Sequence, residues 1–190
     1  RSGTSMMMQM LEAAGLDIFT DKERTADDSN PKGYYEHEAV KNLQHNNKWL
    51  PEAKGKVVKI IAQLLSHLPA NYHYQVIFME RDVLEVIASQ QKMLVRDGKR
   101  VNEDTLQLQL VNQYTQTVDK VKEWAENQPN VDIIFLSHQE VVKNPFLKAM
   151  LVNDFLSGQL PVEKMASAVD KNLYREKKEK FNHSGTFAKG

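Results

Sequence analysis

Three short runs rich in β-branched residues constrain the fold of this chain more than any other feature. They cover residues 57–61, 76–79 and 131–136, and each is bounded by polar or turn-forming residues. Two patterns with helical periodicity, at 83–95 and 104–127, lie between the second and third runs. Strands that alternate with helices predict an α/β fold with a parallel sheet and right-handed crossovers.

Length and charge bound the kind of protein that this sequence can form. Its 190 residues are about one domain's worth, and we interpret residues 1–190 as a single domain. The 25 basic and 25 acidic residues cancel, so no charge imbalance points to nucleic acid or an anionic membrane as a partner. The absence of Cys excludes a disulfide scaffold and fits a cytoplasmic protein. No apolar stretch is long enough to cross a bilayer, so we expect no membrane partner.

The first helix is predicted near the beginning of the chain. Apolar side chains recur with helical spacing from Met7 to Ala14, and Gly15 is a natural left-handed stop. We expect the methionines of this helix to lie in the core. Residues 17–30 are polar and acidic, which indicates a surface segment.

A second helix start is predicted directly after the last strand. Ser137 and Glu140 have the spacing of a capping box, in which a hydroxyl accepts from the third amide of the helix. Pro145 then either breaks that helix or begins another one.

Residues 1–5 open directly into the first helix and carry the strongest local signal. Amide groups at a helix N-terminus, its positive dipole and the neighbouring hydroxyls can bind a phosphate. A Ser- or Thr-capped helix whose Gly3 merely permits the turn explains the same residues equally well. Thr4 stands where a Walker loop requires Lys, which counts against an ATP or GTP hydrolase.

Arg81 follows the second predicted strand. The carboxyl ends of parallel strands form the edge where open α/β sheets bind ligands, and a guanidinium suits bidentate phosphate recognition. The alternative is a surface pair with Asp82 or Glu85, which contributes little energy. The opening loop and the strand order together favour the phosphate interpretation.

Four separated segments resemble the sulfotransferases that use 3′-phosphoadenylyl sulfate, particularly their compact bacterial members. They are the loop at 1–5, Arg81 with Ser89 eight positions later, residues 30–36 and residues 165–175. The resemblance implies a P-loop-like α/β fold, a three-layer parallel sheet flanked by helices whose first strand is missing or truncated here. It implies that the opening loop binds the 5′-phosphosulfate, while Arg81 and Ser89 bind the 3′-phosphate. The implied cofactor-binding residues are Arg1, Ser2, Gly3, Thr4, Ser5, Arg81 and Ser89.

The catalytic base has two candidates by the same resemblance. Many family members use a His just after the strand that corresponds to residues 57–61, whereas some glycan-modifying members use a Glu after the first helix. No His occupies the first place, and His67 comes late enough to be the end of a helix. Glu36 is therefore our first choice as base and His37 our second, although a solvated or helix-capping carboxylate explains Glu36 equally well.

Other residues receive expectations that the structure can examine. Arg1 is expected to act on the leaving 5′-phosphate. Tyr34 and Tyr35, beside a turn that contains Gly, are expected to contact substrate. Lys59 lies in an apolar run, where it either points outward or reaches the site from the end of the strand, and the outward direction is favoured. No spacing of His and carboxylates suggests a metal.

The sequence thus predicts a cytoplasmic sulfotransferase that moves a sulfuryl group from 3′-phosphoadenylyl sulfate to a hydroxyl or amine. The acceptor is expected to be a small molecule or a glycan. A nucleotide-phosphate kinase of the same fold is one alternative, against which the missing Walker Lys counts. A non-catalytic nucleotide-binding or interaction protein is another, favoured by the absent His and by a tail at 181–187 that lacks the Arg-Lys-Gly loop of larger members.

Overall fold

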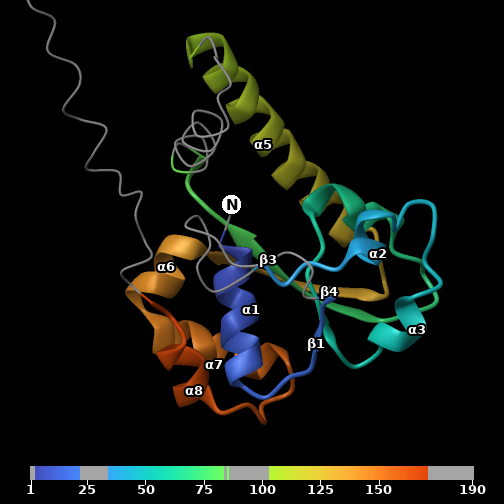
Figure 1. Ribbon diagram of the computed structural model, residues 1–190. Coiled ribbons are helices and arrows are strands. Elements are labelled where there is room, and N and C mark those ends of the chain that lie inside the picture. Colours follow the sequence, from blue (N-terminus) through green and yellow to red (C-terminus); the bar gives the residue numbers. More distant parts are fainter. Residues whose placement is uncertain (1–2, 22–33, 84, 86–102, 171–190) are drawn as a thin grey trace, which may run out of the picture.

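The computed structural model describes residues 3–21, 34–83, 85 and 103–170 (Figure 1). In chain order the helices and strands are α1 (Thr4–Ala13), β1 (Ile18–Phe19), α2 (Glu38–Lys41), α3 (Leu50–Ala53), β2 (Val57–Val58), the 3-10 helix η1 (Ala62–His67), β3 (Tyr74–Glu80), α5 (Glu103–Glu126), β4 (Val131–Ser137), α6 (His138–Lys143), α7 (Pro145–Phe155) and α8 (Val162–Ser167). No helix within these residues has the length and apolar character needed to span a bilayer.

The two longest strands, β3 and β4, pair in parallel. Tyr74 lies opposite Val131 and Glu80 lies opposite Ser137, with an unbroken register between them. The chain passes through α5 between the two strands, close to the helix predicted at 104–127. The predicted parallel pairing and its connecting helix are therefore confirmed, while nearly all of the helix predicted at 83–95 lies outside the described residues.

A second parallel pair joins β1 to β2, with Phe19 opposite Val58. The strand predicted at 57–61 is shorter than expected, because β2 ends at Val58 and the chain soon enters η1. The prediction that residues 17–30 all lie on the surface is wrong at Phe19, which is buried with its ring stacked 5.4 Å from that of Trp49. A strand of two residues is too short for an alternation pattern to reveal it.

Helices pack on both faces of the β3–β4 pair. Ile77 and Met79 face one side, where they join a core cluster with α1, α7 and α8. Phe78 lies between them and faces the other side, since successive residues of a strand alternate, and its ring centroid is 5.4 Å from that of Phe135. Lys122 of α5 lies 5.4 Å from the centre of the Phe135 ring. A mixed fold with parallel strands is thus confirmed, while a continuous three-layer sheet stays a prediction because the described strands form two separate pairs.

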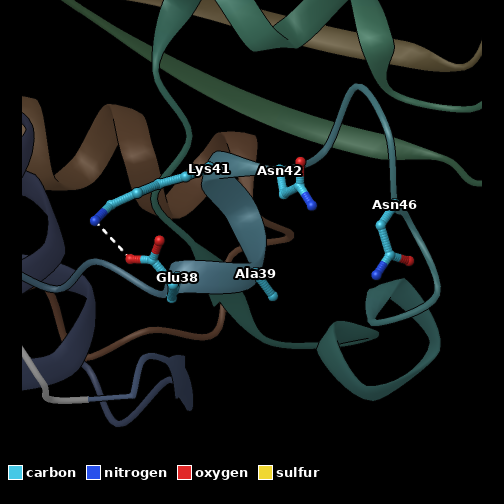
Figure 2. A pocket seen from close by; sticks show the side chains of 5 residues that line it. All are labelled: Glu38, Ala39, Lys41, Asn42 and Asn46. Atoms are coloured by element: carbon cyan, nitrogen blue, oxygen red, sulfur yellow. Dashed lines mark hydrogen bonds and ion pairs between the residues drawn. The ribbon is translucent and has the colours of Figure 1, made fainter.

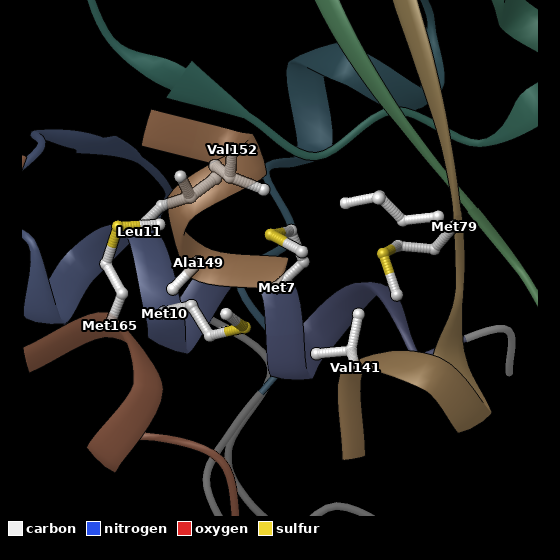
Figure 3. Packing of buried hydrophobic residues seen from close by; sticks show 9 residues of the cluster. Met7, Met10, Leu11, Met79, Val141, Ala149, Val152 and Met165 are labelled. Atoms are coloured by element: carbon white, nitrogen blue, oxygen red, sulfur yellow. The ribbon is translucent and has the colours of Figure 1, made fainter. Parts of the chain in front are cut away.

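The main core lies between α1 and the C-terminal helices (Figure 3). Its buried members are Met7, Met10, Leu11, Met79, Leu136, Val141, Ala149, Val152 and Met165. The core position predicted for the methionines of α1 is confirmed for Met7, Met8 and Met10. Gly15 has a φ of 87° just past α1, as predicted for its C-terminal stop. This packing fixes α1, and with it the position of Gly3 at the start of the helix.

The predicted helix start after β4 is also confirmed. The Ser137 hydroxyl accepts a hydrogen bond from the amide of Glu140 at 3.4 Å, and α6 follows. Pro145 begins a new helix, α7, where its missing amide proton removes no intrahelical hydrogen bond.

A second, smaller core lies beside the β1–β2 pair. It lies among β1, β2, α2, α3 and η1, and its buried residues are Phe19, Val40, Leu43, Trp49, Leu50, Ala53 and Leu64. The segment 34–37 runs between this small core and α1, because it precedes α2 and makes a side-chain contact with Glu12.

Candidate active site

The start of α1 requires glycine for two reasons. Gly3 has a φ of 97°, in the left-handed region that favours glycine. A Cβ at this position would also collide with the ring of His138. The Gly3 carbonyl accepts hydrogen bonds from the amides of Met6 and Met7, at 3.0 and 3.2 Å, and so begins the helix. The N-terminal end of α1, where the helix dipole is positive, therefore lies next to His138.

Arg81 is held firmly at the carboxyl end of β3. Its Nε donates a hydrogen bond to Glu85 Oε2 at 2.9 Å. Its amide donates to the Tyr114 hydroxyl at 3.0 Å, and that hydroxyl donates in turn to the Arg81 carbonyl at 3.0 Å. The side chain of Glu85 is 1% exposed and that of Arg81 is 10% exposed. The ion pair anticipated from the sequence therefore exists with Glu85, but it is buried rather than on the surface, and it fixes the guanidinium.

His138 packs against Gly3 and lies near Arg81. It is the first residue after β4, and Ser137 pairs with Glu80, so His138 and Arg81 leave neighbouring strands at one edge. Burial, and then the positive charge of Arg81, lower the pKa of His138 to about 4. This imidazole is neutral at pH 7. Gly3 contacts one side of it, and Arg81 lies near enough for its positive charge to disfavour protonation of the ring.

Lys59 joins the opening loop to the candidate base. Its Nζ donates to the Tyr34 carbonyl at 2.6 Å and lies 3.4 Å from both Ser5 Oγ and Glu36 Oε1. The prediction that Lys59 points outward is wrong, since its side chain is only 14% exposed. The physical reason is that β2 ends at Val58, so the alternation of a strand no longer governs the direction of the next side chain.

Glu36 lies at the border between the site and solvent. Its side chain is 27% exposed and forms the ion pair with Lys59. Its carbonyl accepts a hydrogen bond from Thr20 Oγ1 at 2.8 Å, which fixes the backbone beside β1. The carboxylate is thus partly shielded from water and is linked through one ammonium group to the hydroxyl of Ser5.

The neighbouring His37 has a structural role that the sequence did not reveal. Its Nδ1 accepts a hydrogen bond from the amide of Ala39 at 3.1 Å and caps α2. Its ring stacks on Phe19 with centroids 4.2 Å apart, and Nδ1 lies 3.7 Å from Asp21 Oδ2. These contacts favour Glu36 over His37 as the base.

The two tyrosines differ in their surroundings. Tyr34 is buried, and the centre of its ring lies 5.8 Å from Lys59 Nζ. The Tyr35 hydroxyl donates to Glu12 Oε2 at 2.6 Å. Substrate contact by either ring stays a prediction, and the predicted site residues Arg1, Ser2 and Ser89 lie outside the described part of the chain.

One cavity opens at the edge of the β3–β4 pair. It has a volume of about 380 Å³, and Arg81, Tyr114, Ser137 and Gln139 are among the residues that line it. The cavity is therefore adjacent to the end of each long strand, on the side of α5.

A second cavity, of about 400 Å³, lies on α2 (Figure 2). Its lining residues are Glu38, Ala39, Lys41, Asn42 and Asn46. The Lys41 ammonium is 2.7 Å from Glu38 Oε2, so the two charges here neutralise each other. None of the predicted site residues lines this cavity.

Sequence reasoning misses His138 in this constellation and favours a Lys59 that points away from it. No motif marks His138, and the alternation of an apolar strand favours the outward direction for Lys59. Their position directly after β2 and β4 is the signal that could have found them, because residues after parallel strands gather at one edge of a sheet.

Comparison with known proteins adds an independent finding. The family model described as Sulfotransferase domain matches residues 1–186 of the chain. No curated protein and no solved structure gives a significant match. Since the family match spans almost all of the 190 residues, the chain belongs to the Sulfotransferase domain family, whose fold is the P-loop-like α/β fold.

Proposed function

We propose that this protein transfers a sulfuryl group from 3′-phosphoadenylyl sulfate to the hydroxyl or amine of a small-molecule or glycan acceptor. The observation that carries the proposal is the position of Lys59 Nζ, 3.4 Å from both Ser5 Oγ and Glu36 Oε1. One cation thereby joins the loop proposed to bind the phosphosulfate to the carboxylate proposed as base. The proposal includes the three-layer sheet, in which the two strand pairs are parts of one parallel sheet.

The residues suit the two anions at the ends of such a donor. Gly3, Thr4 and Ser5 begin α1, whose N-terminal dipole favours a phosphate. Arg81 offers a guanidinium whose plane is fixed by Glu85. His138 packs against Gly3 and lies near this guanidinium, and its neutral imidazole adds no charge of its own. We assign the 5′-phosphosulfate to the loop and the 3′-phosphate to Arg81, together with Arg1, Ser2 and Ser89.

The chemistry follows from these positions. Glu36 accepts the proton of the acceptor hydroxyl or amine as that atom forms its bond to sulfur. The bond between sulfur and the 5′-phosphate oxygen breaks, and its electron pair stays on the phosphate. Lys59, the Ser5 hydroxyl and the loop amides stabilise the negative charge that develops there. The acceptor thus gives its proton to Glu36 and gains the sulfuryl group, and the donor leaves as 3′-phosphoadenosine 5′-phosphate.

The test measures transfer of labelled sulfuryl from the donor to a panel of hydroxyl and amine acceptors. Glu36→Gln removes the base but keeps the side-chain volume, so we expect turnover to fall by about 100-fold or more while binding of 3′-phosphoadenosine 5′-phosphate is retained. Glu38→Gln is the matched control, because Glu38 is an exposed carboxylate paired with Lys41. Full activity of Glu36→Gln would remove Glu36 as the base.

A further inference from the structure

Tyr35 has a backbone conformation that is unusual for a bulky residue. Its φ is 55°, and among the described residues other than glycine only Ser157 shares a positive φ. A left-handed conformation at such a side chain is strained and persists where the surroundings enforce it. Tyr35 immediately precedes Glu36, the proposed base.

The side chain of Tyr35 is hydrogen-bonded to α1. The Tyr35 hydroxyl donates to Glu12 Oε2 at 2.6 Å, across 23 residues of chain. Glu12 follows Leu11, which is buried in the main core, so the carboxylate is carried by a firmly packed helix. Burial and then Glu12 raise the pKa of Tyr35, so its hydroxyl keeps its proton and remains a donor throughout the neutral pH range.

The residues on either side of Tyr35 are fastened to other elements. The Tyr34 carbonyl accepts from Lys59, while the Glu36 carbonyl accepts from Thr20. The Tyr35 side chain therefore contacts α1, and the Glu36 side chain contacts Lys59. With an extended backbone at Tyr35, the two side chains would point in different directions relative to each other, and both contacts could not be kept.

We infer that Tyr35 and Glu12 form a positioning pair, which holds the left-handed backbone at residue 35 and so keeps the Glu36 carboxylate beside Lys59. This inference rests on the proposed function insofar as Glu36 is the base. It gives Tyr35 a role other than the substrate contact expected from the sequence, since the hydroxyl is already engaged by a carboxylate.

Kinetic measurements on single and double variants test the pair. Tyr35→Phe and Glu12→Ala each remove the hydrogen bond, and we expect kcat to fall by about tenfold, with the KM for the donor unchanged, because a hydrogen bond to a charged group is lost. The double variant loses no more than either single variant if the two side chains act as a unit. Glu12→Gln retains an acceptor oxygen and is expected to restore most of kcat.

A matched control exists in β3. The Tyr74 hydroxyl donates to the Pro69 carbonyl at 2.9 Å, away from Glu36 and Lys59. Tyr74→Phe therefore removes a comparable hydrogen bond and is expected to leave kcat at the wild-type value.

A crystal structure of Tyr35→Phe tests the inference without turnover. We expect φ at residue 35 to leave the positive region and the contact between Lys59 Nζ and Glu36 Oε1 to be lost. A retained positive φ with the contact still near 3.4 Å overturns the positioning role, as does an unchanged kcat. If the wild-type protein transfers no sulfuryl group, the proposed function fails, while this structure still decides whether the pair positions Glu36.

Discussion

Lys59 is the residue on which the proposed chemistry depends most. Its ammonium group has only three positions in which to donate, and it is shared among a carbonyl, a hydroxyl and a carboxylate. The short distance of 2.6 Å to the Tyr34 carbonyl anchors the group, while Ser5 and Glu36 lie farther away at 3.4 Å. Lys59 can therefore approach an anion bound at the start of α1 while it keeps its hydrogen bond to the Tyr34 carbonyl.

We expect Lys59→Met to lower kcat by about 100-fold to 1,000-fold, the loss typical of one group that stabilises developing charge. The apolar side chain keeps most of the volume of lysine and removes only the ammonium. Initial rates at saturating donor provide the measurement, and Lys54→Met, at an exposed lysine near α3, is the control. A variant that retains the wild-type kcat would exclude Lys59 from the transition state.

His138 makes the free energy of unfolding depend on pH. Its pKa is about 4 in the folded state, below the ordinary value of 6.5, so between these pH values the unfolded chain binds a proton that the folded chain does not. The free energy of unfolding therefore has its full contribution from His138 above pH 6.5 and loses about 3 kcal/mol as the pH falls to 4. Denaturant titrations across this range, on the wild type and on His138→Asn, provide the measurement. Identical pH slopes for the two proteins would contradict this assignment.

At the scale of elements, α1 carries both the core and the start of the site. Its buried methionines pack against α7 and α8, while its first residues meet His138. Substitutions on the buried face of α1 are therefore expected to displace the residues at the start of the helix as well.

We expect Met10→Ala to lower the free energy of unfolding by about 2–5 kcal/mol, because the side chain is fully buried and its removal leaves a cavity. Met150 on α7 is 43% exposed, so Met150→Ala serves as the control with an expected change within about 0.5 kcal/mol. Chemical denaturation gives both values. Equal losses in the two variants would show that α1 is not anchored in this way.

The elements that sequence reasoning predicted well are those with a long periodic signal. The strands β3 and β4 and the helix α5 were predicted close to their observed bounds, and so was the beginning of α6 at Ser137. No pattern predicts β1, because two residues carry no period. The strand predicted around β2 is too long, because Ile60 and Ile61 continue an apolar run past the last paired residue.

The site was only partly predictable for a related reason. Gly3 and Arg81 could be identified because each stands at a recognisable boundary between a loop or strand and a helix. The contacts of His138 and Lys59 arise only when separate strands are brought to one edge, and the bond between Tyr35 and Glu12 joins two elements with no shared pattern. Such relations depend on tertiary packing, which a single sequence does not display.

In the molecule as a whole, the proposed function requires that one nucleotide reach both α1 and the end of β3. Gly3, Thr4 and Ser5 are positioned by the main core through α1, and Arg81 is positioned by α5 through Tyr114. A ligand that contacts both places is expected to stabilise the molecule as a unit. A ligand at about 100 times its dissociation constant adds about 2.7 kcal/mol to the free energy of unfolding.

Titration calorimetry with two nucleotides tests this requirement most directly. Removal of Arg81 alone would leave a buried carboxylate without the guanidinium, so the variant compared is Arg81→Gln combined with Glu85→Gln. We predict that the wild-type protein binds 3′-phosphoadenosine 5′-phosphate about 10-fold to 100-fold more tightly than adenosine 5′-monophosphate, and that the variant loses this preference. Equal affinities of the wild type for the two nucleotides, or tighter binding of ATP with magnesium, would contradict the account.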